Sequence, residues 1–124
     1  MKKEIAIQYL KHLENGEIEN IIDLFHSEGI VDSPIYGIKK VNVFYNELNN
    51  DTSNSKLTLR GIFEENDSKT IALYFTYHWT LKNKEVVTFD VVDIIDFDSN
   101  HKILKLKIIY DTVNARQLVN QLKD

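Results

Sequence analysis

At 124 residues the chain has the length of one domain, and 43% apolar residues suffice to bury a core without cross-links. The absence of cysteine excludes disulfides, thiolate metal sites and cysteine nucleophiles. Its net charge is −4, and its fifteen basic residues are spread among nineteen acidic ones, which argues against a nucleic-acid partner because such a partner needs a clustered basic face. We therefore expect a single domain over residues 1–124.

The first residues combine two lysines with no continuous apolar run behind them. Such a segment has the features of neither a signal peptide nor a membrane span. We therefore expect a cytoplasmic protein that has no membrane partner.

The first fifty residues show the periodicity of three helices. Apolar residues recur every three or four positions from Ile5 to Leu13, and Gly16 then supplies a helix end. The same spacing predicts a second helix from residue 18 to near residue 29 and a third over residues 41–48. Between these two, the segment Ile30–Pro34 is typical of a short strand that enters a turn, because proline disfavours the helical conformation in the residue before it.

The period changes from helical to alternating after a polar loop at residues 49–55. Alternation predicts strands over residues 57–64, 70–81, 85–97 and 102–111, and a last helix over residues 114–122. Helices that precede a run of strands indicate an α+β fold with an antiparallel sheet.

The loops between the long strands predict which side chains share a face. If Asn83-Lys84 is a two-residue hairpin loop, Tyr74 lies opposite Asp93, and directly opposed residues share a face. A four-residue loop at residues 98–101 then places Asp93 opposite Leu106. The face that mixes apolar residues with isolated polar ones is the expected inner face, and it carries Tyr74, Thr76, His78, Thr80, Val87, Phe89, Val91, Asp93, Leu106, Ile108 and Tyr110.

The other face of the same strands carries Phe75, Tyr77 and Trp79. It is too apolar to leave in water, and large exposed apolar patches usually mark interfaces. We therefore expect a two-fold homodimer through this outer face, unless the C-terminal helix covers part of it.

The order of elements, the run Gln8-Tyr9-Leu10, the run Val31-Asp32-Ser33-Pro34 and the run Val92-Asp93-Ile94 together suggest a known fold. The chain resembles the cone-shaped fold of nuclear transport factor 2, which ketosteroid isomerases and SnoaL-like polyketide cyclases share. The resemblance implies N-terminal helices on a curved, mainly antiparallel sheet that encloses a pocket, plus a C-terminal helix. It also implies a small apolar molecule in the pocket and, if the protein is an enzyme, an isomerase, cyclase or dehydratase without a cofactor.

Ketosteroid isomerases, an established case of pKa tuning, use an aspartate base together with a tyrosine and a neutral carboxylic acid that hydrogen-bond the enolate oxygen. The resemblance places the tyrosine at Tyr9, the carboxylic acid at Asp93 and the base at Ser33. A serine hydroxyl without an activating partner cannot accept a proton near neutral pH as a carboxylate does. Asp32, next to Ser33, and His78, on the expected inner face, are the candidates to replace the base.

The remaining candidates are residues expected to line the pocket and bind the ligand. No set of His, Asp and Glu residues has the spacing of a metal site. The ligand-binding candidates are Ser33, Tyr45, Tyr74, Phe89, Val91, Leu106, Ile108 and Tyr110.

Three functions fit these features. The first is an enzyme that polarises a carbonyl oxygen of an apolar ligand through Tyr9 and Asp93. The second is a binding domain that keeps the pocket but has lost the base, which Ser33 favours. The third is a dimerising accessory domain with a filled core, in which Asp93 makes only a structural hydrogen bond.

Overall fold

The computed structural model describes residues 1–123 and confirms the α+β class. The three helices, the four long strands and the last helix are present where periodicity predicts them, apart from the differences given below. The elements in chain order are α1 (Lys2–Asn15), α2 (Ile18–Asp23), β1 (Phe25–Ser33), β2 (Gly37–Lys40), α3 (Val41–Asp51), β3 (Thr52–Glu64), β4 (Thr70–Leu81), β5 (Val86–Phe97), β6 (Ile103–Ile109) and α4 (Val113–Lys123).

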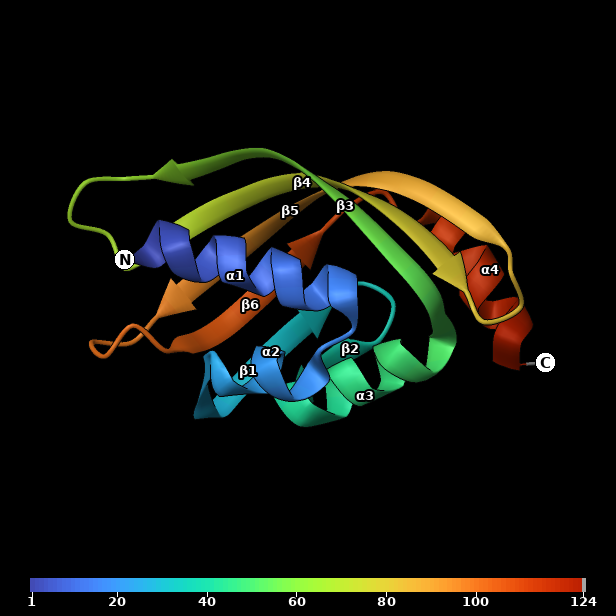
Figure 1. The fold of residues 1–124 in the computed structure, drawn as a ribbon, viewed down its shortest axis with the longest axis horizontal. Coiled ribbons are helices and arrows are strands. Elements are labelled where there is room, and N and C mark those ends of the chain that lie inside the picture. The colour runs from blue at the N-terminus through green and yellow to red at the C-terminus, as the bar shows by residue number, and fades with distance from the viewer. Residues whose placement is uncertain (124) are drawn as a thin grey trace.

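The strands form one curved sheet in the order β2-β1-β6-β5-β4-β3. Every neighbouring pair is antiparallel except β1 and β6, which are parallel. The long strands arch over α1, and α4 lies next to the end of the sheet where β4 turns into β5 (Figure 1). This is the cone shape that the sequence predicts, with helices on the concave side.

Two predicted boundaries are wrong. Phe25 begins β1 and does not continue the second helix, because this segment pairs with Ile103 of β6. The polar residues Thr52 to Ser55 belong to β3 and not to a loop, because β3 reaches back to pair with the far end of β4. In both places strand pairing decides the conformation, and the local sequence does not show it.

The hairpin between β4 and β5 differs from the predicted one by a single residue. The backbone N–H of Leu81 donates to the carbonyl oxygen of Glu85, so the loop has three residues, and the last of them, Lys84, has a φ of 74°. Asp93 therefore lies opposite Leu73 and not opposite Tyr74. A shift of one residue moves every side chain of a strand to the other face, so the predicted face of β4 is wrong.

The register between β5 and β6 differs from the predicted one by two residues, since Asp93 lies opposite Ile108 and not opposite Leu106. An even shift keeps each side chain on its face. The inward direction of Phe89, Val91 and Asp93 is therefore predicted correctly, although their partners are not.

The corrected face of β4 removes the predicted dimer surface. Phe75, Tyr77 and Trp79 point into the concave side and are 2%, 7% and 2% exposed. A homodimer stays a prediction, but these three side chains cannot form its interface because they are core residues. Among residues 1–123, no helix is both long enough and apolar enough to cross a membrane.

Candidate functional site

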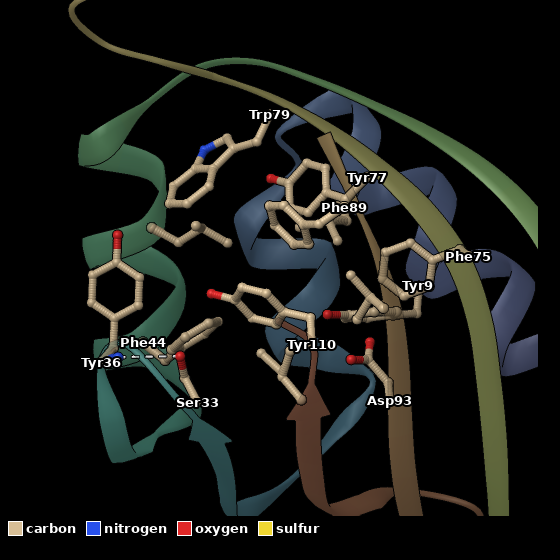
Figure 2. A pocket seen from close by; sticks show the side chains of 14 residues that line it. Tyr9, Ser33, Tyr36, Phe44, Phe75, Tyr77, Trp79, Phe89, Asp93 and Tyr110 are labelled. Carbon is tan, nitrogen blue, oxygen red and sulfur yellow. Dashed lines mark hydrogen bonds between the residues drawn. The ribbon is translucent and has the colours of Figure 1, made fainter. Parts of the chain in front are cut away.

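A cavity lies between the concave face of the sheet and the helices α1 and α3 (Figure 2). Its volume is about 40 Å³, which is room for roughly two or three water molecules. Aromatic side chains dominate its wall, and they are Tyr9, Tyr36, Phe44, Phe75, Tyr77, Trp79, Phe89 and Tyr110.

Asp93 is the one charged residue among the described residues that line this cavity. It is held by the middle of β5 and is 1% exposed, and its Oδ1 atom has no hydrogen-bond partner among residues 1–123. Burial raises the pKa of the Asp93 carboxyl well above its usual range, because a charge in an apolar site loses its hydration. Burial therefore favours the neutral, protonated form of the carboxyl group, whose Oδ1 atom has no partner among residues 1–123.

Tyr9 reaches the same cavity from α1. Figure 2 shows its ring beside the Asp93 carboxyl group, with both directed into the cavity. The Tyr9 hydroxyl lies 2.6 Å from the hydroxyl of Tyr45 on α3, and both residues are buried. Burial, with Tyr45 and Asp93 close by, raises the pKa of Tyr9 well above its usual range, so its hydroxyl keeps its proton.

Ser33 lines the cavity at the end of β1, and its hydroxyl oxygen has a structural task. It accepts the backbone N–H groups of Ile35 and Tyr36, each at 3.2 Å, and so fixes the turn that follows the strand. In Figure 2 the ring of Tyr110 stands between Ser33 and Asp93. The position implied for a base is thus occupied by a residue that builds the turn.

Neither candidate for a replacement base lines the cavity. Asp32 alternates with Ser33 along β1, so its side chain leaves the opposite face of the strand. His78 lies on the convex face of the sheet, where its Nδ1 atom is 3.1 Å from the Thr88 hydroxyl. The prediction of His78 as an inner residue is wrong because of the one-residue shift of the β4–β5 hairpin.

The predicted ligand-binding residues separate into three groups. Ser33, Phe89, Val91, Ile108 and Tyr110 line the cavity together with Tyr9 and Asp93. Tyr45 and Leu106 are fully buried next to the site but do not form its wall. Tyr74 lies on the convex face with His78, for the same reason of register.

Most of the aromatic residues in the cavity wall were not among those predicted from the sequence to line it. Phe75, Tyr77 and Trp79 alternate with polar residues and form the largest apolar stripe of β4, which was itself a signal for burial. Phe44 belongs to the apolar spacing that predicts the third helix, whereas Tyr36, in the turn after β1, had no signal of its own.

Two rings close the middle of the cavity. Phe89 of β5 and Tyr110, just after β6, stack with their centroids 4.3 Å apart and an angle of 17° between the planes. The cavity is too small for a ring-sized ligand in this arrangement, so such a ligand requires side chains of the wall to move.

The buried side chain of Asp51 connects the cavity wall to α4 through hydrogen bonds. Asp51 is 1% exposed and accepts a hydrogen bond from the Tyr36 hydroxyl at 2.6 Å. The Nζ atom of Lys123 lies 3.1 Å from both Asp51 oxygens, and Arg116 donates to the carbonyl oxygen of Pro34 at 2.6 Å. These contacts fasten both ends of α4 to the segments that carry the cavity wall. Among residues 1–123, no group of three His, Asp or Glu side chains could hold a metal ion.

Comparison with known proteins identifies the fold. No family model matches the sequence, and no curated protein matches it. An NTF2-like protein of unknown function from Burkholderia pseudomallei superposes with a TM-score of 0.83, at 14% identity over 95% of this chain and 96% of the other. The epoxide hydrolase/cyclase-like enzyme SalBIII, described for pyran ring formation in the polyether salinomycin, gives a TM-score of 0.79, at 15% identity over 91% and 92% of the two chains.

A third similar structure is a hypothetical protein with a ketosteroid isomerase-like fold from Catenulispora acidiphila, solved in complex with trimethylamine. It superposes with a TM-score of 0.76, at 10% identity over 87% of this chain and 85% of the other. At these identities the likeness establishes the fold alone. The chain has the NTF2-like fold that ketosteroid isomerase-like and cyclase-like proteins share, as the sequence resemblance predicts.

Proposed function

We propose that this protein binds a small, largely apolar molecule in the cavity and polarises a carbonyl oxygen of that molecule through Tyr9 and Asp93. The observation that carries the proposal is the unpartnered Oδ1 atom of Asp93, buried and directed into an aromatic cavity. A buried polar atom without a partner costs about 1–3 kcal/mol, and a ligand that satisfies this atom recovers that free energy.

The chemistry follows from the protonation states. A neutral Asp93 donates a hydrogen bond to the ligand oxygen, and the Tyr9 hydroxyl is a second donor at the same place. Two donors that are already in position stabilise negative charge as it develops on an oxygen, which assists enolisation or ring closure. The similar structures support a small-molecule pocket of this kind, because one holds trimethylamine and another acts in pyran ring formation.

The same site favours a second candidate, a binding domain without catalysis. Proton transfer in an isomerase requires a base within hydrogen-bonding reach of the substrate. Among the described residues that line the cavity, none is a histidine, and Asp93, the single residue with a carboxyl group, is the proposed hydrogen-bond donor and not a base. The Ser33 hydroxyl accepts the backbone N–H groups of the turn and does not supply the missing base. The site therefore supports polarisation of a ligand better than it supports a complete isomerase reaction.

Titration with a ketone and its oxygen-free analogue tests the proposal. Trp79, the single tryptophan, lines the cavity, so its fluorescence reports binding directly. We expect 2-cyclohexenone to bind about tenfold more tightly than cyclohexene, the gain of one to two hydrogen bonds. This preference should disappear in Asp93→Leu and weaken in Tyr9→Phe, whereas Tyr74→Phe on the convex face should keep it.

Equal affinity of the wild type for both compounds would contradict polarisation by Tyr9 and Asp93. Turnover of enolisable ketones separates the two candidates, since the binding domain should bind them unchanged. Native mass spectrometry of the freshly purified protein provides an independent measurement, because a co-purified small molecule identifies the ligand class.

A further inference from the structure

The strand β5 is longer than its neighbour β6 and therefore has an open edge. The pairing with β6 begins at Val92, opposite Ile109, and continues toward Phe97. From Val86 to Val91, β5 pairs with β4 on one side and has no strand on the other among the described residues. Figure 1 shows β4 and β5 continuing past the end of β6 toward α4.

The hairpin geometry decides which backbone groups face this open edge. The bond from the Leu81 N–H to the Glu85 carbonyl directs the backbone groups of Glu85 toward β4. Hydrogen-bonded and non-hydrogen-bonded pairs alternate along an antiparallel ladder. The N–H and C=O groups of Val86, Thr88 and Asp90 therefore point away from β4, as those of Val92 do where it meets β6. No backbone partner for them is found within residues 1–123.

The chain leaves room beside this edge. After Ile109 it turns away to start α4, and two adjoining hollows of about 380 and 120 Å³ lie between the edge and the first turns of that helix. Val86 and Thr88 form one side of the larger hollow, and Asn114, Gln117 and Leu118 form the other. An extended chain next to β5 would thus meet backbone groups on one side and amide and apolar side chains on the other.

The charged residues that line these hollows are acidic. Glu85 and Asp111 line them and are exposed, and Asp90 at the open edge is exposed as well. No lysine or arginine is among the described residues that line either hollow. Val86 and Val113 are 59% and 73% exposed and add apolar surface to the same region.

We propose that the β5 edge between Val86 and Val91 is a docking site for an extended, basic peptide segment of another protein, which adds to the sheet as an antiparallel strand next to β5. Main-chain hydrogen bonds to a sheet edge give affinity, and alternate side chains give specificity. Here the alternate side chains would be apolar ones against Val113 and Leu118 and basic ones near Glu85 and Asp111. A second copy of this chain fits poorly, because pairing about Thr88 would bring the acidic rims of both copies together.

Hydrogen exchange of the free protein tests the edge itself. The amides of Val86, Thr88 and Asp90 should exchange at least about a hundredfold faster than those of Val87 and Phe89, which donate to β4. Protection of the first three amides in the free, monomeric protein would overturn the proposal, because the edge would then already be paired.

The peptide acetyl-Lys-Thr-Val-Thr-Val-Lys-amide is the probe for docking. It should slow the exchange of these three amides about tenfold or more at saturation, and the same peptide with glutamate in place of lysine should bind about tenfold more weakly. N-methylation of the peptide amides that face β5 should abolish binding. Absence of protection at millimolar peptide, or equal affinity for both charge types, would overturn the basic-peptide assignment.

A matched pair of variants locates the site. Thr88→Pro removes an edge-facing N–H, at a position where proline is tolerated, together with the hydroxyl that contacts His78, and should abolish binding. Thr88→Val loses the same hydroxyl but keeps the N–H and should bind as the wild type does. Equal binding by both variants would contradict strand addition here, and self-association blocked by Thr88→Pro without peptide binding would assign the edge to a second copy.

Discussion

The hydroxyl groups of Tyr9 and Tyr45 lie 2.6 Å apart in the buried interior, and the carboxyl group of Asp93 lies in the same interior. The two tyrosines come from α1 and α3, which are separated by α2 and the first two strands. Each hydroxyl has the other as its partner, whereas the Oδ1 atom of Asp93 has none. The fold therefore holds a satisfied pair of hydroxyls next to an unsatisfied acid, and this asymmetry gives the site its chemical character.

Removal of the Tyr45 hydroxyl should destabilise the protein although the residue does not line the cavity. In Tyr45→Phe the buried Tyr9 hydroxyl loses its partner, which costs about 1–2 kcal/mol in the free energy of unfolding. Urea denaturation measures this loss, and Tyr74→Phe on the convex face is the control, with a change under about 0.5 kcal/mol. An equal loss in the free energy of unfolding in both variants would show that the Tyr9–Tyr45 contact does not stabilise the protein more than the hydroxyl of Tyr74 does.

The carboxyl group of Asp93 should make the protein less stable as the pH rises. Its pKa in the folded state is raised above the unfolded value, so the folded state holds the proton more tightly. Stability is then greatest below the unfolded pKa and falls as the pH increases from there toward the folded pKa, by about 1.4 kcal/mol for each unit of separation. Asp93→Asn should remove this dependence.

Thermal unfolding of the wild type and Asp93→Asn between pH 3.5 and 8 checks the sign. The thermal stability of Asp93→Asn relative to that of the wild type should increase steadily with pH. A gain of the wild type over the variant with rising pH would mean that Asp93 is ionised and paired in the folded state.

Asp51 should contribute more to stability than Lys123, one of the two lysines that contact it. Asp51→Ala removes a buried carboxyl group, leaves the half-buried Tyr36 hydroxyl without its acceptor, and should cost about 2–3 kcal/mol. Lys123 is 54% exposed, so Lys123→Met should cost less than about 1 kcal/mol, as solvent screens exposed ion pairs. Chemical denaturation measures the loss in the free energy of unfolding for both variants. A larger loss in Lys123→Met than in Asp51→Ala would contradict the argument from burial.

The stacked rings of Phe89 and Tyr110 should limit access to the cavity. Tyr110→Ala removes one ring of the stack, and we expect faster association of 2-cyclohexenone, measured by stopped-flow fluorescence of Trp79. The same change should cost about 2–4 kcal/mol of stability, because it leaves space in a packed region. Ile109→Ala, whose side chain is 47% exposed, is the control and should leave the association rate unchanged.

The loop between β4 and β5 should accept glycine at one position and not at another. Lys84 has a φ of 74°, a conformation in which non-glycine residues are strained. Lys84→Gly should therefore stabilise the protein by about 0.5 kcal/mol, the relief of strain less the added chain entropy. Lys82→Gly, where φ is not positive, should be neutral or destabilising in the same thermal unfolding measurement.

The fold class could be predicted from the sequence because hydrophobic periodicity survives in α1, α3, α4 and the long strands β4 and β5. The spacing from Ile5 to Leu13 fixes a buried helix face, and α1 indeed buries Ala6, Tyr9, Leu10 and Leu13. The inward direction of Phe89, Val91 and Asp93 could also be predicted, because the β5–β6 register is shifted by two residues and a shift of two keeps each side chain on its face. Five of the eight predicted ligand-binding residues line the cavity for these reasons, as do Tyr9 and Asp93.

The face of β4 could not be read from loop length. One additional loop residue, Lys82, in a loop that ends with Lys84 in a left-handed conformation, exchanges Tyr74 and His78 for Phe75, Tyr77 and Trp79 in the pocket wall. The sequence by itself determined the elements, the curved α+β sheet and a buried tyrosine and aspartate. The tertiary structure decided which aromatic rings surround them, that the Ser33 hydroxyl stabilises the turn after β1, and that β5 extends beyond the end of β6. These features depend on pairing between strands rather than on the residues within one strand.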